Sequence, residues 1–374
     1  MRITKVSVFS LDLPTDGGGY RRQTGFAQDI NVTTIVQIDT DEGITGFGEM
    51  CPTGPYYMQA FPEGAVAGIP VVARHLIGED PIQIERLNKL MDVKMKGQNY
   101  VKSAIDIALW DIAGQAFDRP VCELLGGRYE KPIPLYRTLH LFKQHDDTPE
   151  MLAQRARDYK AMGYYHLQIK GGGAPERDIA NVLAVAEVAD PTDTYYIDAN
   201  TGWSLYNAMR IAKGVEGTRC IIEQPCATLE EIATLRRHTN LPIKLDESME
   251  SIYDLLRAHQ MQAIDICCIK IGRVGGLTKA RRMRDMCVEL GISVVAEETW
   301  GSDFAHAAAA HFAQSTHSKY CLCSTDLANY VTIKTADGTP ETKNGCFEAT
   351  SAPGLGLKPR MDVLGKPVAV VSKN

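Results

Sequence analysis

Long hydrophobic runs are absent from this sequence, and their absence excludes one class of protein. No window of its 374 residues approaches the roughly 18 apolar residues that a membrane-crossing helix needs, so we expect no membrane partner. No basic run stands out either. The 40 lysines and arginines face 46 aspartates and glutamates, and a net charge of −6 argues against nucleic acid as a partner. The opening stretch MRITKVSVFSLDLP lacks the apolar segment of a signal peptide, so we expect a cytoplasmic protein.

Metal-type cysteine pairs are also missing. None of the ten cysteines are spaced as CxxC, which argues against a zinc site, and most lie in apolar runs such as DICCIK. We interpret them as buried, reduced thiols. No glycine-rich dinucleotide fingerprint opens the first strand–helix unit, which argues against an open nucleotide-binding sheet.

The patterns that are present divide the chain into two domains. Over the first 60 residues, stretches such as ITKVSVFSLDLP alternate as antiparallel strands do, and from about residue 67 the pattern becomes helical, as in YVKSAIDIALWDIAGQAF. This predicts an α+β domain over residues 1–127. Across residues 128–330, seven or eight short apolar strands alternate with amphipathic helices. That repetition predicts a parallel α/β sheet closed into a barrel.

Charged residues stand at or near the ends of six of these strands, 23 to 28 residues apart. They are Lys170, Asp198, Glu223, Asp246, Lys270 and the pair Glu297 and Glu298. A single charge at a strand end is usually a solvated rim residue. Six at one strand–helix period would instead converge on the catalytic face of a barrel.

The residue types suggest a chemistry. Asp198, Glu223 and Asp246 would offer three hard oxygen ligands, which favours Mg²⁺ over zinc. Lys170 and Lys270 flank them and, with pKa values lowered by nearby cations, could remove and return a proton next to a metal-bound carboxylate. A phosphate loop at IKGGG is a weaker reading, because its lysine precedes the glycines.

These motifs resemble the enolase superfamily, in its mandelate racemase/muconate lactonizing branch. The similar stretches are YVKSAIDIALWDIAGQ, HLQIK, DAN, EQP, LDES, IKIGRVGGLTKA and SAPGLGLKP. The resemblance implies a (β/α)7β TIM-like barrel whose capping domain is completed by residues 331–374. It also implies a homo-oligomer, from dimer to octamer, that binds one Mg²⁺ per subunit, with Mn²⁺ as a substitute.

By the same resemblance Asp198, Glu223 and Asp246 are the metal ligands, and Lys170 and Lys270 are the acid–base pair. Gln168 departs from the pattern, because relatives often carry a lysine there, and so removes a positive neighbour of Lys170. Asn200 would project to the same face as Asp198 and support the metal ligands.

Two further stretches bear on the substrate. Tyr57 in CPTGPYYMQAF and Trp300 in EETWGSDF match relatives that resemble proline-betaine and hydroxyproline-betaine epimerases, in which aromatic faces hold a quaternary ammonium. Glu297 or Glu298 would lie near that group. The alternative is that both aromatic residues only pack the cap against the barrel. We also expect the loop 16–26 to close over the ligand, while His140 either faces the barrel mouth or is buried as a structural residue.

The resulting prediction is a Mg²⁺-dependent racemase or epimerase acting on a small carboxylate. It would remove and return the α-proton of a proline-type amino acid or its betaine through a metal-stabilised enolate. The alternative is a cis-3-hydroxy-L-proline dehydratase that eliminates hydroxide from the same enolate. Two other readings are an inactive barrel that only binds a ligand and a phosphate-handling barrel with its site at TWGSDF.

Overall fold

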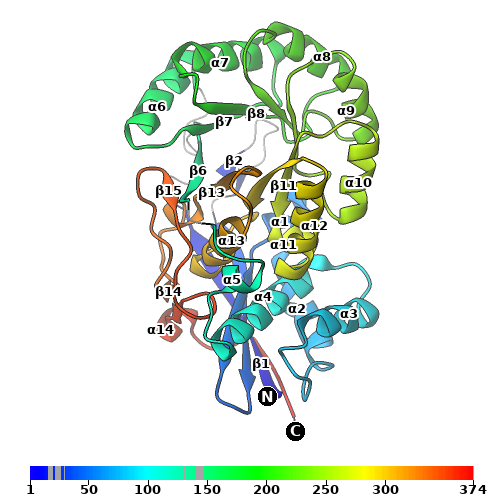
Figure 1. Cartoon of the computed structure of the whole chain (residues 1–374), viewed down its shortest axis with the longest axis vertical. Coiled ribbons are helices and arrows are strands. Elements are labelled where there is room, and N and C mark those ends of the chain that lie inside the picture. The colour runs from blue at the N-terminus through cyan, green and yellow to red at the C-terminus, as the bar shows by residue number, and fades with distance from the viewer. Residues whose placement is uncertain (16–19, 22–26, 29, 130, 140–146, 374) are drawn as a thin grey trace.

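The structure of the chain is a computed structural model that describes residues 1–15, 20–21, 27–28, 30–129, 131–139 and 147–373. Most of the loop expected to close over a ligand lies outside these residues, and so does His140. Figure 1 shows a cap that carries both chain ends and, beside it, a barrel enclosed by an arch of helices.

The cap is built on an antiparallel sheet that joins the two ends of the chain. Its strands follow the order β17 (Ala369–Ser372), β1 (Ile3–Pro14), β4 (Ile30–Thr40) and β5 (Thr45–Met50). Because β17 pairs with β1, the expected completion of the cap by the C-terminal segment is confirmed.

Helices cover this sheet, and the longest of them is almost completely buried. They are α2 (Pro62–Ala73), α3 (Ile84–Lys94) and α4 (Asn99–Ala116). Helix α4 lies directly on β5, where Gly46 and Gly48 leave room for its backbone. A Cβ at Gly48 would stand 2.1 Å from the carbonyl oxygen of Ala104, so only glycine allows this approach.

The barrel has eight parallel strands. In spatial order they are β6 (Ile133–Thr138), β7 (His166–Lys170), β8 (Thr194–Asp198), β9 (Ile221–Glu223), β10 (Ile243–Leu245), β11 (Ile266–Lys270), β12 (Ser293–Glu297) and β13 (Cys321–Thr325). The pairing of β13 with β6 closes the sheet on itself.

A helix follows each of the first seven strands. These helices are α6 (Pro149–Ala161), α7 (Pro175–Val188), α8 (Leu205–Gly214), α9 (Leu229–Arg236), α10 (Ile252–Gln260), α12 (Leu277–Glu289) and α13 (Asp303–Gln314). Directly after strand β13 the described chain forms a short 3₁₀ turn, Leu327–Asn329, in the place of an eighth barrel helix. The predicted (β/α)7β barrel with an α+β cap is therefore confirmed.

The helix starts are readable in the sequence. Four of them are capped by a serine or threonine whose hydroxyl accepts a backbone N–H three residues ahead, and these caps are Thr148, Ser204, Thr228 and Ser251. At Thr228 the side chain of Glu231 also accepts the N–H of the cap residue, which completes a capping box.

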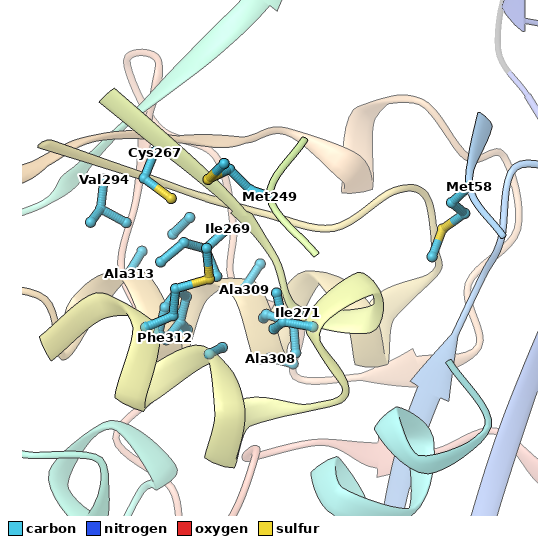
Figure 2. Close-up of a cluster of buried hydrophobic side chains, with 14 of the residues drawn as sticks. Met58, Met249, Cys267, Ile269, Ile271, Val294, Ala308, Ala309, Phe312 and Ala313 are labelled. Atoms are coloured by element: carbon cyan, nitrogen blue, oxygen red, sulfur yellow. The ribbon is translucent and has the colours of Figure 1, made fainter. Parts of the chain in front are cut away.

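Alternate side chains of strand β11 face the surrounding helices on one side and the barrel interior on the other. Figure 2 shows Cys267 and Ile269 in one apolar cluster with Val294, Phe312 and Ala313, on the side of the strand that faces the helices. Successive strand residues point to opposite faces, so Cys268 and Lys270 point into the barrel. None of the helices within the described ranges is both long and apolar enough to cross a membrane.

Candidate active site

Strand register brings the predicted charges together at one end of the barrel. Lys170 pairs with Asp198, Asp198 with Glu223, and Lys270 with Glu297 across neighbouring strands. Since the strands are parallel, all of these side chains lie at the C-terminal barrel end, and Tyr57, in helix α1 (Gly54–Tyr57) of the cap, reaches them.

A cavity of about 70 Å³ opens among these residues. Nine of the predicted site residues line it, namely Tyr57, Gln168, Lys170, Asp198, Asp246, Lys270, Glu297, Glu298 and Trp300. Glu223 and Asn200 contact members of this lining. The volume is smaller than the roughly 150 Å³ that accommodates a benzene ring, so a ring-shaped ligand requires side chains to move.

Lys170 defines one side of the cavity. Its Nζ lies 2.6 Å from Asp198 Oδ2. The amide of Gln168 donates to Asp198 Oδ2 at 3.4 Å and to Glu223 Oε2 at 3.2 Å. Gln168 therefore links two of the predicted metal ligands and holds their oxygens towards each other without adding a charge.

Lys270 stands on the other side. Its Nζ lies 2.5 Å from Glu297 Oε2 and 3.3 Å from Asp246 Oδ2. Burial opposes the charge, but Asp246, together with Glu297, raises the pKa of Lys270 well above its ordinary value. A base needs a lower pKa. Neutralisation of Asp246 by a bound divalent cation would remove part of what holds the proton on Lys270.

Asp246 is the most heavily contacted carboxylate of the site. Arg273 Nη1 lies 2.6 Å from Asp246 Oδ1, and the Tyr57 hydroxyl donates to Oδ2. Burial disfavours the ion, but Lys270 and Arg273 hold the pKa of Asp246 well below its ordinary value. The sequence reading missed Arg273, although it lies three residues beyond Lys270 within the IKIGRVGG motif.

Lys244 was also missed. It is fully buried inside the barrel, with its Nζ 2.8 Å from Glu223 Oε1, 3.4 Å from Glu297 Oε1 and 4.3 Å from the centre of the Tyr196 ring. Lys244 stands two positions before Asp246, and this period of two along PIKLDES was the available signal that it faces the interior.

Two of the three predicted metal ligands, Glu223 and Asp246, lie close enough together to share a cation. Oxygens of Glu223 and Asp246 and the Sγ of Cys268 all lie within 4.8 Å of one another. Burial, with Asp198 and Asp246 nearby, raises the pKa of Glu223 to about 8. The raised pKa indicates that nearby positive charge does not fully offset the repulsion among these carboxylates.

The thiol of Cys268 contributes little to that donor set. Burial, with Asp246 nearby, raises its pKa well above the ordinary value, so the thiol stays protonated at neutral pH. By ligand type, the three predicted carboxylates would favour Mg²⁺ over zinc.

Asn200 links the predicted ligands to a further, half-buried acid. Its backbone N–H donates to Asp198 Oδ1 at 2.9 Å, and its side chain donates to Glu247 Oε1 at 3.0 Å. Burial, then Asp246 and Asp198, raise the pKa of Glu247 to about 7. Asn200 has φ 45° and Gln224 has φ 36°, and left-handed non-glycine residues of this kind concentrate at functional sites.

The two aromatic residues predicted to contact substrate both line the cavity. The Trp300 ring packs against Tyr330 with centroids 5.6 Å apart. The Tyr57 ring lies 5.6 Å from Lys270 Nζ and 5.1 Å from the Arg273 guanidinium, so its face already meets two cations of the protein itself.

A closed, capped barrel whose mouth gathers buried carboxylates and lysines defines an enzyme that acts on a small molecule. Residues 26–126 match the family described as mandelate racemase/muconate lactonizing enzyme, N-terminal domain, and residues 151–363 match the family described as enolase C-terminal domain-like. The chain belongs to the enolase superfamily, in the mandelate racemase/muconate lactonizing branch.

Individual relatives include both elimination and epimerisation enzymes. A cis-3-hydroxy-L-proline dehydratase from Roseibium aggregatum is 41% identical over 99% of both chains. A hydrophobic dipeptide epimerase from Enterococcus faecalis is 30% identical, covering 87% of this chain and 91% of its own. A mandelate racemase/muconate lactonizing enzyme structure from Roseovarius nubinhibens, complexed with magnesium, matches with a TM-score of 0.93 at 32% identity over 100% of both chains.

Proposed function

We propose that this protein is a Mg²⁺-dependent dehydratase that removes water from a hydroxylated proline, with cis-3-hydroxy-L-proline as the leading substrate. The observation that carries α-proton removal is the presence of two lysines, on β7 and β11, on either side of three acidic strand ends. Similarity to the Roseibium dehydratase along the whole chain supports elimination as the outcome. Dehydration was the alternative prediction from the sequence, and we propose it here ahead of epimerisation.

Metal binding, proton removal and positioning would be carried out by different residues. Asp198, Glu223 and Asp246 would hold the cation, which when bound draws electron density from the substrate carboxylate and makes the α-proton easier to remove. Lys170 would take that proton as a neutral amine. The contacts of Gln168 and Lys244 keep the carboxylates in position and limit the repulsion among them.

A second candidate is epimerisation at the α-carbon of a proline-type amino acid or its betaine, which was our leading prediction. Lys270, across the cavity from Lys170, supports it, because a second base can return a proton to the opposite face. The Trp300 ring at the cavity supports a betaine in particular. Both candidates share α-proton abstraction and differ in what happens afterwards.

Proton NMR in D₂O distinguishes the two. The protein would be incubated with Mg²⁺ and a panel of proline, hydroxyproline and betaine ligands. Dehydration yields an unsaturated or keto product together with loss of the substrate ring signals. Loss of the α-proton signal with an intact ring would assign an epimerase instead, and no exchange with any ligand would refute both assignments.

We further propose one Mg²⁺ per subunit, replaceable by Mn²⁺, in a homo-oligomer that works in the cytoplasm. Titration calorimetry of the chelator-treated protein gives the stoichiometry directly, and a Glu223→Gln variant tests the site. Two ions per subunit, or unchanged affinity in that variant, would contradict the assignment.

A further inference from the structure

Glu298, immediately after β12, is a buried acid with one unused oxygen. The side chain lines the cavity, and the residue is 3% exposed. Its Oε2 accepts the N–H of Thr299 at 3.1 Å, and the backbone N–H of Gly272 also donates to the carboxyl group. Its Oε1 is buried and has no hydrogen-bond partner among the residues that the structure describes.

An unused buried oxygen is costly unless something else contacts it. A buried polar atom without a partner destabilises the fold, so its position at a ligand cavity points to the ligand as its partner. Gly272 makes the arrangement possible, because a Cβ there would lie 3.0 Å from Glu298 Oε2.

The carboxyl group is also suited to carry a proton. Burial raises the pKa of Glu298 to about 8, so the group is mainly protonated at neutral pH. Since Oε2 accepts the N–H of Thr299 and Oε1 accepts none in the described residues, the proton belongs on Oε1. A protonated Oε1 is a donor that has no acceptor in the described part of the protein.

Other acids of the cavity are less suited to this role. Asp198 accepts from Lys170, Asp246 from Lys270 and Arg273, and Glu297 from Lys270, so these carboxylates already serve as acceptors for cationic donors. The Lys270 ammonium could give up a proton, but two carboxylates already hold it. Among the acids that line the cavity in the described part of the chain, Glu298 is therefore the carboxyl group with a proton to donate.

We propose that Glu298 is the general acid that protonates the departing hydroxyl group during dehydration, an assignment that rests on the proposed function. Lys170 takes the α-proton, and the C–H electron pair becomes the C2–C3 double bond. The C3–O bond breaks with its electron pair moving to oxygen, and Glu298 Oε1 gives its proton to form water. The enzyme is left with an ammonium at Lys170 and a carboxylate at Glu298. Lys170 then gives a proton to solvent and Glu298 takes one from solvent, which returns the enzyme to its starting state.

The geometry agrees with the stereochemistry of the proposed substrate. In cis-3-hydroxy-L-proline the hydroxyl group is on the carboxylate side of the ring, opposite the α-proton. Base and acid must therefore approach from opposite faces. Glu298 follows β12, which pairs with the Lys270 strand, while Lys170 is on β7 across the barrel.

The test is a Glu298→Gln variant assayed with Mg²⁺ in D₂O. We expect water elimination to fall by about 10²–10⁴-fold, the usual contribution of a general acid. Incorporation of α-deuterium into unreacted substrate should persist within a few-fold, because Lys170 is untouched. A cis-3-chloroproline analogue loses chloride, which needs no proton, so its elimination should also stay within a few-fold. Glu298→Asp, which keeps the acid, should recover part of the lost elimination.

Glu49→Gln is the matched control. Glu49 is another fully buried carboxyl group of raised pKa, but its oxygens accept from Thr33, Ser302 and Ala305. The control should leave the ratio of elimination to exchange unchanged.

Three results would overturn the assignment. Equal losses of exchange and elimination in Glu298→Gln would reduce Glu298 to a structural role. Undiminished elimination would assign the acid to another group. A wild-type protein that exchanges but never eliminates would refute the proposed dehydration itself, and the role of Glu298 with it.

Discussion

Replacement of Lys244 by methionine tests whether the interior of the barrel depends on a buried cation. Methionine keeps the length of the side chain and removes its charge. Lys244 is fully buried between Glu223 and Glu297, which are 1% and 2% exposed. Water cannot replace the lost contact, and removal of one partner from a buried ion pair typically costs about 3–5 kcal/mol.

The control is Lys102→Met in the cap. Lys102 is also buried, at 2% exposed, but its partner Asp92 has a side chain that is 44% exposed. Water can solvate Asp92 after the change, so the pair should behave as a surface pair worth about 0–1 kcal/mol. The two variants thus remove the same buried ammonium group, once from carboxyl groups that water cannot reach and once from a carboxylate that water can solvate.

Thermal unfolding in the presence of chelator measures the difference. At about 2 °C per kcal/mol for a chain of this size, Lys244→Met should lower Tm by roughly 6–10 °C and Lys102→Met by about 2 °C or less. Adding Glu223→Gln to Lys244→Met removes the acid that has lost its lysine partner, whereas Glu297 keeps Lys270, so the second change should restore part of the loss. Equal Tm values for the two single variants would refute the reasoning.

Three further predictions follow from the same contacts. Lys170→Ala should abolish α-proton exchange in D₂O while Mg²⁺ affinity in calorimetry stays within a few-fold, and wild-type exchange would remove Lys170 from the base role. Trp300→Ala should weaken binding of proline betaine more than binding of proline, because only the betaine presents a quaternary ammonium, and equal losses would reduce Trp300 to packing. Burial raises the pKa values of Glu223 and Glu298 from 4.5 to about 8, so each stabilises the folded state fully below pH 4.5 and loses that contribution as the pH rises towards 8. In chelator, the free energy of unfolding in urea should therefore fall by up to about 1.4 kcal/mol per pH unit for each group between pH 7 and 8, and a rise would contradict the assignment.

The barrel and the approximate site were predictable because both depend on local periodicity. A strand–helix repeat of 23 to 28 residues fixes which residues end strands, and parallel strands carry those ends to one face. Lys170, Asp198 and Glu223 could be grouped without any knowledge of their contacts.

The pairing of these charges could not be predicted in the same way. Whether Asp246 meets Lys270, Arg273 or the Tyr57 hydroxyl depends on side-chain reach across the closed barrel and on how the cap docks. Lys244 and Cys268 were overlooked because each stands two residues before a conspicuous charge and was taken for part of the apolar strand. Residues two positions apart on a strand share a face, so Lys244 and Cys268 should have been expected to point into the barrel with Asp246 and Lys270.

Besides acting on the substrate, a bound cation would change the protonation of the two lysines. A lysine that serves as counter-ion to a carboxylate holds its proton and cannot accept another. Lys170 is bound to Asp198, and Lys270 is bound to Asp246 and Glu297. Asp198 and Asp246 are also predicted metal ligands. Cation binding by these carboxylates would take over their charge, weaken both lysine contacts and lower the free energy needed to deprotonate the amines. The metal and the bases are therefore coupled through shared carboxylates, and the amines should titrate at lower pH in the presence of Mg²⁺ than in chelator.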